Sequence, residues 1–453
     1  MDALACASTS NAQAVVGVHA VQLKTGKVLH DQQGSNSFTP ASNTKLFSAA
    51  LALTRLGPDH TFETRLAADT EPNDQGVLQG DLYWVGGGDP TLGSRSYSRF
   101  RDDSKLADVL DQFVAAVEKR GIRHITGNIV GDETRFPRDL YPIGWTVDDA
   151  VADYGAPVSA LTLHDNVQAL GLSPWAVRFT PPLEYYTVFN QIRVGDEANI
   201  QVDRAAGGSR QLLLTGYSPG DKVVTELVAV EDPAHFAAAI LHDALSRRGI
   251  RVDGQPAVRT RRVGEPLPPR PAVTFATRTS PPLIEVLRVI EKVSQNLFAE
   301  LVLREVALVR SGEATRQATQ REMNQFLWQV GVNPECCYFQ DGSGLSRQTL
   351  VTPRAVAKVL AFMHRSEHRD AWLGLMPIGG VDGSLTRRFD FDKENGKRIR
   401  AKTGSLSHVA ALSGYAASKT HGDVAFSIIL NHFNGFAAEA REIIDKIAVA
   451  IAE

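Results

Sequence analysis

The chain has 453 residues, 43% of them apolar and 22% charged, with a formal net charge of −3. This length and composition predict two or three globular domains and argue against a disordered protein. The sequence has no long basic block, which disfavours nucleic acid as a partner. It also has no apolar run of the ~18 residues that a transmembrane segment needs.

A β-hairpin is expected over residues 15–30, where β-branched residues flank the turn Thr25-Gly26. The next expected element is a helix that begins at Ser42 and continues through the helix formers of 46–53. Residues three apart lie on one face of a helix, so Lys45 is expected beside the hydroxyl of Ser42. Because 46–53 is apolar on nearly every side, this helix is predicted to be buried, with its first turn facing a cleft.

The middle of the chain has the pattern of an insertion. It contains many short strand-like runs with Gly and Asp turns, plus helical patterns at about 105–120 and 233–248. We expect the insertion to begin near Leu66 and to end near Arg270. The proline-rich stretch 264–271 suits a stiff linker at that boundary.

The last third of the chain is expected to complete the domain that the hairpin begins. Ser294-Gln295-Asn296 lies between two apolar helical stretches, and Lys402-Thr403-Gly404 lies between strand-like runs. Strands are expected over 409–417 and 424–430, followed by an amphipathic helix at about 437–452. The two ends of the chain then form one antiparallel sheet with helices on its faces, an α+β fold whose middle is inserted in a surface loop.

Ser42 and Lys45 form an S-x-x-K pair, which alone is weak evidence of catalysis. A serine hydroxyl is a poor nucleophile and needs a base, which a lysine can supply if its amine is neutral. Burial, a nearby helix N-terminus and a second cation such as Lys402 would all lower the pKa of Lys45. The alternatives are that Ser42 only caps a helix and that Lys45 is solvated, although the apolar helix makes the second unattractive.

Three motifs occur in the order S-x-x-K, S-x-N, K-T-G, and they are accompanied by the phrases 85–92, 154–161 and 341–347. With these motifs the chain resembles the penicillin-recognising serine acyl-transferases. Within them it resembles the class C low-molecular-mass penicillin-binding proteins. These are D-Ala-D-Ala carboxypeptidases/endopeptidases of the penicillin-binding protein 4 (DacB) type, peptidase family S13. Ser294 follows Lys45 by 249 positions, which fits a large insertion. Gln295 stands where that family often has Asp, and no chemistry is expected of this side chain.

The resemblance implies a domain organisation. A β-lactamase-like penicillin-binding domain is expected over 1–66 plus 271–453. An inserted domain is expected over 67–90 plus 156–270, and a third, nested domain over 91–155. Both inserted domains are expected to be mainly β.

The resemblance also implies roles for the motif residues. Ser42 would be the nucleophile, Lys45 the base, and Ser294 the proton relay to the leaving D-alanine amine, helped by Lys402. Asn296 would bind Lys45 and the substrate amide, unless it is only a helix cap.

The K-T-G strand would bind the substrate. The N–H groups of Ser42 and Ser405 would stabilise the oxyanion. Lys402 and Thr403 would hold the terminal carboxylate, and Gly404 would let the backbone come close. The alternative is that Lys-Thr-Gly is an ordinary strand end.

Members of this group recognise the third peptide residue, which in many bacteria is diaminopimelate. Its free amine and carboxylate call for an anion and a cation at the right separation. Asp148 and Arg347 are the candidates, unless Asp148 is an ordinary surface charge. The apolar wall of this pocket is expected to comprise Trp145, Tyr154, Leu345 and Leu406.

No metal or organic cofactor is implied, because the histidines lack metal-site spacing. The expected partners are peptidoglycan peptides and β-lactams. The start Met1-Asp2-Ala3 shows no leader pattern, which fits a cytosolic protein or a mature form. We expect a periplasmic or cell-surface location, because the expected substrate lies there. Cys336 and Cys337 are expected to be free thiols rather than a vicinal disulfide, and 3–6 only faintly resembles a lipobox.

Three functions compete. The first is a serine DD-peptidase that removes the last D-alanine or cuts D-Ala-diaminopimelate crosslinks. Both reactions cleave at the carbonyl of a D-residue, so the sequence does not separate them. The second is a β-lactamase, which needs an activated water, and no class A-type Glu motif follows Ser294. The third is an inactive wall-binding scaffold, which the presence of Ser42, Lys45 and Lys402 disfavours.

Overall fold

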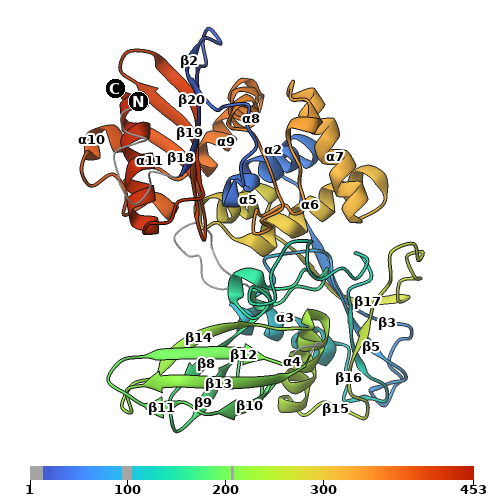
Figure 1. Ribbon diagram of the computed structural model, residues 1–453. Helices are drawn as coiled ribbons and strands as arrows, with labels where there is room; N and C mark the ends of the chain where they lie inside the picture. Colours follow the sequence, from blue (N-terminus) through green and yellow to red (C-terminus); the bar gives the residue numbers. More distant parts are fainter. Residues whose placement is uncertain (1–13, 94–104, 206–208) are drawn as a thin grey trace.

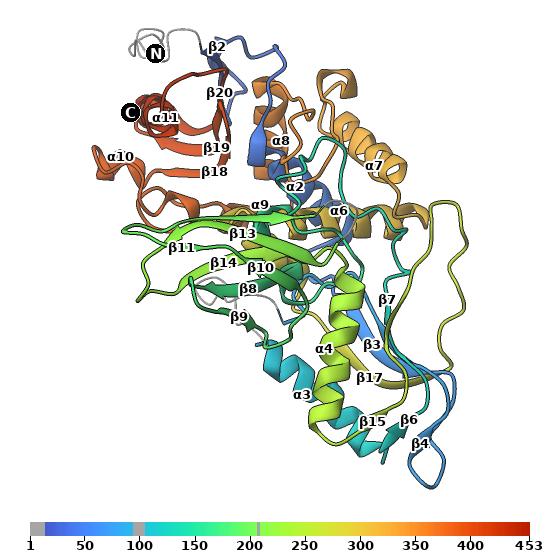
Figure 2. The same ribbon diagram turned by 60° about the horizontal axis from the view of Figure 1, so that its bottom comes forward.

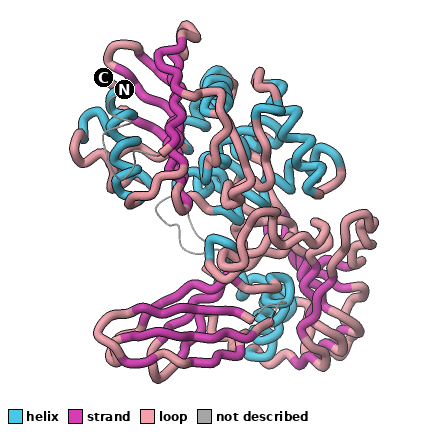
Figure 3. The backbone as a smooth tube through the Cα atoms, in the orientation of Figure 1, coloured by secondary structure: helices cyan, strands magenta, loops and turns pink. Residues whose placement is uncertain are grey.

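The computed structural model describes residues 14–93, 105–205 and 209–453 (Figure 1). Helices gather around a five-stranded sheet in one half of the molecule, and strands dominate the other half (Figure 3). The α+β fold class is therefore confirmed. Among the described residues, no helix is both long and apolar enough to cross a membrane.

The five-stranded sheet joins the two ends of the chain, as predicted. Its order is β18 (Ile399–Leu406), β19 (Val409–Ser418), β20 (Gly422–Asn431), β1 (Val15–Gln22) and β2 (Val28–Gln32). All neighbours are antiparallel, and β1 pairs with β20 along its whole length, from Val15↔Asn431 to Gln22↔Val424. The first and last described strands therefore stabilise each other directly.

Alternating residues of this sheet face two separate cores. Leu412 and Ile428 pack with α11 (Ala437–Ala452), whereas Ala411 and Ile429 belong to the core of the helices on the opposite face. Successive side chains of a strand point to opposite faces, so strands that are buried on both sides must be apolar throughout. This accounts for the largely apolar sequences of β19 and β20, in which the buried Ser413 and Ser427 satisfy each other by a hydrogen bond of 2.8 Å.

The helices on the second face enclose α2 (Lys45–Leu56), all of whose residues from Lys45 to Leu53 are buried. The helices that pack against α2 are α5 (Leu283–Lys292), α6 (Asn296–Ser311), α7 (Arg316–Gln329) and α8 (Pro353–Arg365), and α9 (Arg369–Leu375) packs against α5 and α8. A short helix, α10 (Lys393–Gly396), precedes β18. The apolar character of α2 on every side is explained by its central position.

The inserted part contains the two helices predicted for it, α3 (Leu106–Lys119) and α4 (Pro233–Arg247). They pack against each other between two groups of strands (Figure 2). One group comprises β8 (Val167–Leu172), β9 (Val177–Thr180), β10 (Thr187–Asn190), β11 (Arg193–Val194), β12 (Asn199–Arg204), β13 (Gln211–Ser218) and β14 (Val224–Ala229). The other comprises β3 (Glu63–Ala68), β4 (Val77–Leu78), β5 (Leu82–Val85), β6 (His124–Ile125), β7 (Ile129–Asp132), β15 (Arg251–Val252), β16 (Pro256–Arg259) and β17 (Val273–Thr279).

Strand pairing bears on how the insertion is divided. β3 and β17, where the chain enters and leaves the insertion, pair with each other in antiparallel fashion. β7, which lies within 91–155, pairs with β5 and β16 from the flanking segments. The domain limits at 66, 90, 155 and 270 stay a prediction.

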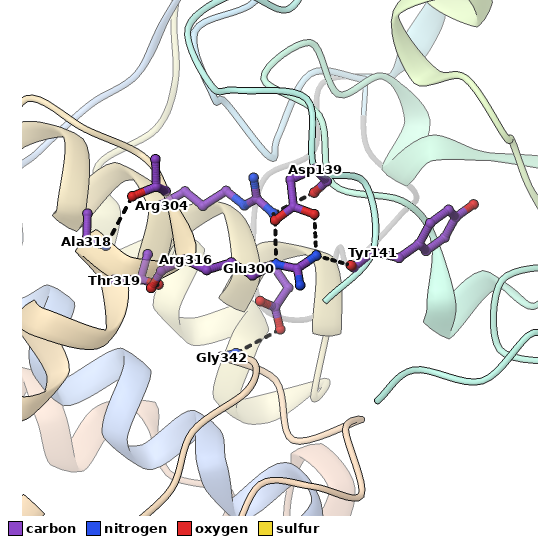
Figure 4. A network of polar contacts seen from close by, with 9 residues as sticks. Asp139, Tyr141, Glu300, Arg304, Arg316, Ala318, Thr319 and Gly342 are labelled. Atoms are coloured by element: carbon purple, nitrogen blue, oxygen red, sulfur yellow. Dashed lines mark hydrogen bonds and ion pairs between the residues drawn. The ribbon is translucent and has the colours of Figure 1, made fainter. Parts of the chain in front are cut away.

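A polar network fastens the insertion to the helical half (Figure 4). Asp139, from the loop after β7, forms an ion pair with Arg316 at the start of α7, and its carbonyl accepts a hydrogen bond of 2.6 Å from Arg304 of α6. Arg316 also donates to the carbonyl of Tyr141 at 2.7 Å. The side chain of Arg304 is only 8% exposed, so the charge of this buried guanidinium depends on the nearby oxygens of Asp139.

We expect Asp139→Ala to lower the free energy of unfolding by about 3 kcal/mol, because the buried Arg304 would lose the carboxylate that lies 3.5 Å from it and Arg316 would lose its ion pair. Denaturant unfolding measures this change. Asp111→Ala is the control, since Asp111 pairs with Arg248 between two exposed side chains, and its loss should cost less than about 1 kcal/mol. Equal losses for the two variants would contradict this role of Asp139.

Candidate active site

Ser42 lies in a 3₁₀ turn, η2 (Ala41–Thr44), which runs directly into α2. The prediction that the α-helix begins at Ser42 is therefore wrong, because α2 begins at Lys45. One local and one distant contact explain the tighter turn: the hydroxyl of Thr44 donates to the carbonyl of Ala41 at 2.9 Å, and the side-chain amide of Asn43 donates to Ser413 of β19 at 2.7 Å. Side chains three residues apart eclipse in a 3₁₀ turn, so Lys45 still lies beside Ser42.

The amine of Lys45 contacts three oxygens. Its Nζ lies 2.9 Å from Ser42 Oγ, 2.6 Å from Asn296 Oδ1 and 2.7 Å from the carbonyl of Ser343. Neither Asn296 Oδ1 nor a carbonyl can donate a hydrogen, so both accept from Lys45. A neutral amine has two N–H groups for them and one lone pair left. That lone pair can accept the hydroxyl hydrogen of Ser42.

Burial favours the neutral form of Lys45. The side chain is fully buried, and this desolvation, followed by the charge of Lys402, holds the pKa of Lys45 well below its usual value. The carboxylates of Asp341, Glu291 and Glu300 act in the opposite direction. The geometry and the charge state together make Lys45 able to remove a proton from Ser42.

Ser294 lies in the short break between α5 and α6, with a φ of +70°. Its Oγ accepts a hydrogen bond of 2.8 Å from Lys402 Nζ, which also donates to the carbonyl of Thr403 at 2.9 Å. Gln295 is the N-cap of α6, since its side chain accepts from the N–H of Leu297. The Gln295 side chain therefore has a structural role at the start of α6.

The edge strand β18 presents Lys402, Thr403, Gly404 and Ser405 to the same region. The N–H of Ala401 donates away from β19, to the carbonyl of Pro377. Alternate residues of a strand share one edge, so the N–H of Ser405 also lies on the free edge. A Cβ at Gly404 would lie 2.6 Å from the carbonyl of Pro40, so only glycine lets the strand approach η2 this closely.

The loop 341–347 supplies a hydrogen-bond acceptor for Lys45, and two carboxylates hold the loop in place. One oxygen of Glu300 accepts from the N–H groups of Gly342 and Ser343 at 2.9 and 2.8 Å (Figure 4 shows Glu300 and Gly342). Asp341 accepts from the N–H of Ser346 and from the indole of Trp145 at 2.7 and 3.1 Å. The carbonyl of Ser343 is thereby fixed as an acceptor for Lys45.

The residues predicted to bind the peptide side chain are brought together only in part. Trp145 and Tyr154, from the insertion, contact residues of the site. The indole of Trp145 donates to Asp341 at 3.1 Å, and the carbonyl of Tyr154 accepts from Asn296 at 2.8 Å. Arg347 is exposed and donates to the carbonyl of Ser407 at 3.0 Å, next to the half-buried Leu406. Leu345, in the same loop as Arg347, is 8% exposed.

Asp148 is exposed, and no ion pair joins it to Arg347 in the part of the chain that the structure describes. The negative charge of Asp148 acts on Tyr154, which the insertion contributes to the site. Burial raises the pKa of Tyr154 most, and the charges of Asp149, Asp153 and Asp148 raise it further. The two charges predicted to bind an amine and a carboxylate are therefore both accessible and not neutralised by each other.

Sequence reasoning missed several residues of this site. Thr403 Oγ1 contacts Ser384 Oγ at 2.8 Å, from the turn η6 (Gly383–Leu385), and no sequence signal marks Ser384. Glu300 and Asp341 were not assigned a role either, and they hold the loop 341–347 that binds Lys45. Glu291 is fully buried in α5, four residues after the buried Leu287, so helical periodicity places it on the apolar face.

Among residues 14–93, 105–205 and 209–453, no group of His, Cys, Asp and Glu could hold a metal ion. Cys336 and Cys337 are free thiols, and burial raises the pKa of Cys337 to about 12. The segment 3–6, with Cys6, lies outside the described residues.

Comparison with known proteins identifies this arrangement. Residues 2–453 match the D-Ala-D-Ala carboxypeptidase 3 (S13) family. The D-alanyl-D-alanine carboxypeptidase of Actinomadura sp. (strain R39) is 34% identical over 462 residues, which cover 97% of this chain and 81% of the relative.

Solved structures agree. The crystal structure of penicillin-binding protein 4 (dacB) from Haemophilus influenzae aligns with a TM-score of 0.85 at 25% identity, covering 100% of this chain and 99% of that one. The same Haemophilus protein complexed with a β-lactam aligns with a TM-score of 0.80 at the same identity and coverage. The chain therefore belongs to the D-Ala-D-Ala carboxypeptidase 3 (S13) family.

Proposed function

We propose that this protein is a serine D-Ala-D-Ala carboxypeptidase that acts on peptidoglycan stem peptides through an acyl-enzyme at Ser42. The observation that carries the proposal is the 2.9 Å contact between Ser42 Oγ and the Nζ of a fully buried Lys45. A buried neutral lysine within hydrogen-bond reach of a serine is the arrangement that activates a nucleophile. The named activity of the Actinomadura relative supports the same reaction.

Acylation would proceed as follows. Ser42 Oγ attacks the carbonyl of the penultimate D-alanine while its proton passes to Lys45. The oxyanion that forms is stabilised by the N–H groups of Ser42 and Ser405. The C–N bond then breaks: the leaving D-alanine amine takes a proton from Ser294, which takes one in turn from Lys402. Water then attacks the ester and gives up a proton that restores Lys402, while Lys45 returns its proton to Ser42 Oγ, so the acid product leaves and every group regains its starting state.

Substrate recognition would use the free edge of β18. Lys402 and Thr403 would hold the terminal carboxylate, and Asn296 the peptide amide. Asp148 and Arg347 would bind the amine and the carboxylate of a diaminopimelate side chain, beside the wall formed by Trp145, Tyr154, Leu345 and Leu406. The accessibility of both charges supports this pocket.

A second activity, cleavage of D-Ala-diaminopimelate crosslinks, would use the same centre, since the attacked carbonyl again belongs to a D-residue. The exposed positions of Asp148 and Arg347 favour it, because a crosslinked peptide needs room there. Digestion of purified crosslinked muropeptides, followed by mass measurement, separates loss of D-alanine from cleavage of the crosslink.

The proposed substrate places the protein outside the cytoplasm, in the periplasm or at the cell surface. β-Lactams would acylate Ser42 as analogues of the D-Ala-D-Ala end. The β-lactam complex of the Haemophilus protein supports binding of these compounds to this fold.

The first test is covalent labelling. A fluorescent penicillin should attach to Ser42 and stay bound for minutes or longer, because the ester it forms resembles the acyl-enzyme. Mass spectrometry of a digest locates the label, and Ser42→Ala should remove it without unfolding the protein. A label on another residue, or one that persists in Ser42→Ala, would rule out Ser42 as nucleophile.

The two lysines should differ in their effects. Lys45→Ala should slow acylation by ~10²–10⁴-fold, the usual contribution of a general base. Lys402→Ala should chiefly raise KM for acyl-D-Ala-D-Ala and weaken protonation of the leaving group. Stopped-flow acylation and steady-state kinetics measure both. Near wild-type acylation by Lys45→Ala would show that another group is the base.

Asp148 and Arg347 should affect selectivity rather than chemistry. Arg347→Ala and Asp148→Ala should each lower kcat/KM about ten- to hundredfold for a peptide with a free diaminopimelate-like end, since one charge-assisted contact contributes about 1.5–3 kcal/mol. A minimal acyl-D-Ala-D-Ala substrate, which lacks that end, is the control and should be spared. Equal losses on both substrates would mean that the side-chain pocket lies elsewhere.

A further inference from the structure

Glu291 is a buried carboxylate beside the catalytic motifs to which the mechanism above gives no role. It lies in the last turn of α5, three residues before Ser294, and is fully buried. Neither of its oxygens accepts a hydrogen bond from any residue that the structure describes. A buried carboxylate without hydrogen bonds is unfavourable as an anion unless a cation lies nearby.

Two cations act on Glu291, and both belong to the proposed catalytic centre. Lys402 of β18 has the larger effect and Lys45 of α2 the smaller, and both favour the charged carboxylate. The neighbouring Lys292 is engaged elsewhere: its amine donates to Asp382 at 2.6 Å and to the carbonyl of Met376 at 2.7 Å. The geometry agrees, because both amines bind residues just after Glu291: Lys402 donates to Ser294 at 2.8 Å and Lys45 to Asn296 at 2.6 Å. The helix α5 also packs against α2, which carries Lys45.

The other carboxylates near this centre differ from Glu291. Glu300 of α6 and Asp341 act on Lys45, but both already accept backbone N–H groups of the loop 341–347. Glu291 is the carboxylate that opposes the loss of charge on Lys402. It is thus placed to act on both lysines at once.

The charges of the three groups can balance one another. Burial raises the pKa of Glu291 and lowers the pKa of Lys402, and each of these two groups opposes the shift of the other. With Glu291 ionised, Lys402 protonated and Lys45 neutral, the trio has no net charge, which is the least unfavourable state in a dry core. The proposed mechanism needs this same state, because Lys45 must be neutral to accept the proton of Ser42 and Lys402 must be protonated beside Ser294.

We propose that Glu291 is a positioning residue that acts through the two lysines: its carboxylate is the counter-ion that keeps Lys402 protonated while Lys45 stays neutral. Glu291 does not touch the substrate. This inference rests on the proposed function, because its effect is measured on acylation of Ser42.

The pH dependence of acylation tests this role. The rate should fall on the acid side as the coupled groups Lys45 and Glu291 take up protons, and on the alkaline side as Lys402 loses its proton. The profile is then bell-shaped, and the apparent pKa values of its acid and alkaline limbs belong to the coupled groups. Removing the negative charge in Glu291→Gln lowers the pKa of both lysines. Both limbs should therefore move to lower pH, by about 1–3 pH units as expected for the loss of a nearby opposite charge.

Two variants serve as controls. Glu291→Asp keeps the charge and should keep both limbs near their wild-type positions. Glu300→Gln is the matched buried variant: both N–H groups of the loop reach one oxygen of Glu300, which an amide can replace. Glu300 acts on Lys45, whereas Glu291 is the one carboxylate among the described residues that opposes the lowered pKa of Lys402, so Glu300→Gln should move only the acid limb.

The measurement is the second-order rate of labelling by a fluorescent penicillin between about pH 5 and 10, with circular dichroism and thermal melting at each pH. Glu291→Asn is the second neutral variant if Glu291→Gln does not fold. A lower rate at every pH with unmoved limbs would overturn the proposal and make Glu291 a packing residue. Absence of labelling in the wild type would instead refute the proposed function, and this inference with it.

Discussion

The burial of the Lys45 amine is the constraint on which the rest of the site depends. In water a lysine is protonated at neutral pH and cannot be a base, so its surroundings must make the charged form unfavourable. The apolar helix α2 lies at the centre of the helical half and takes the side chain out of solvent. A buried amine must still use its hydrogen bonds, and Asn296 and the carbonyl of Ser343 accept them. Both acceptors are in turn positioned by other parts of the chain: Asn296 by the start of α6, and Ser343 by the carboxylate of Glu300.

The insertion contributes to this same centre. Its loop after β7 is fastened by Asp139 to Arg304 and Arg316, and farther along the loop Trp145 and Tyr154 contact Asp341 and Asn296. Asp341 and Asn296 are neighbours of Lys45, so the insertion and the base share a continuous set of hydrogen bonds. A change in the insertion can therefore alter the surroundings of Lys45 without any contact with it.

Much of the fold and the motif geometry could be predicted from the sequence, because the signals were local or periodic. The S-x-x-K spacing places Lys45 beside Ser42 in either kind of helical turn, and the apolar strands of 409–431 indicate a sheet buried on both faces.

The features that the sequence predicted wrongly or missed depend on contacts between residues far apart in the chain. The 3₁₀ turn at Ser42 is fixed partly by the bond from Asn43 to Ser413, 370 positions away. The helical spacing from Leu287 places Glu291 on the apolar face of α5, but only the packing of α5 against α2 brings its charge to act on the two lysines of the site. The roles of Asp148 and Arg347 stay a prediction, since exposed side chains take their positions from a ligand as much as from the fold.

The edge of β18 is open only where the proposed chemistry needs it. Edge strands are liable to pair with other chains, and proteins usually cover them. Here the first half of the edge is covered, because Arg400 pairs with Ile378, and the N–H of Ala401 donates to Pro377. The covering segment ends there, so the N–H of Thr403 and the backbone groups of Ser405 lie on the uncovered edge, while the carbonyl of Thr403 accepts from Lys402. The uncovered part of the strand, residues 403–406, is too short to pair stably with a strand of another chain but long enough to align the end of a short peptide. The close approach of Gly404 to η2 brings this free edge to within reach of Ser42, so the site that would bind the peptide and the group that would attack it are set by one backbone contact.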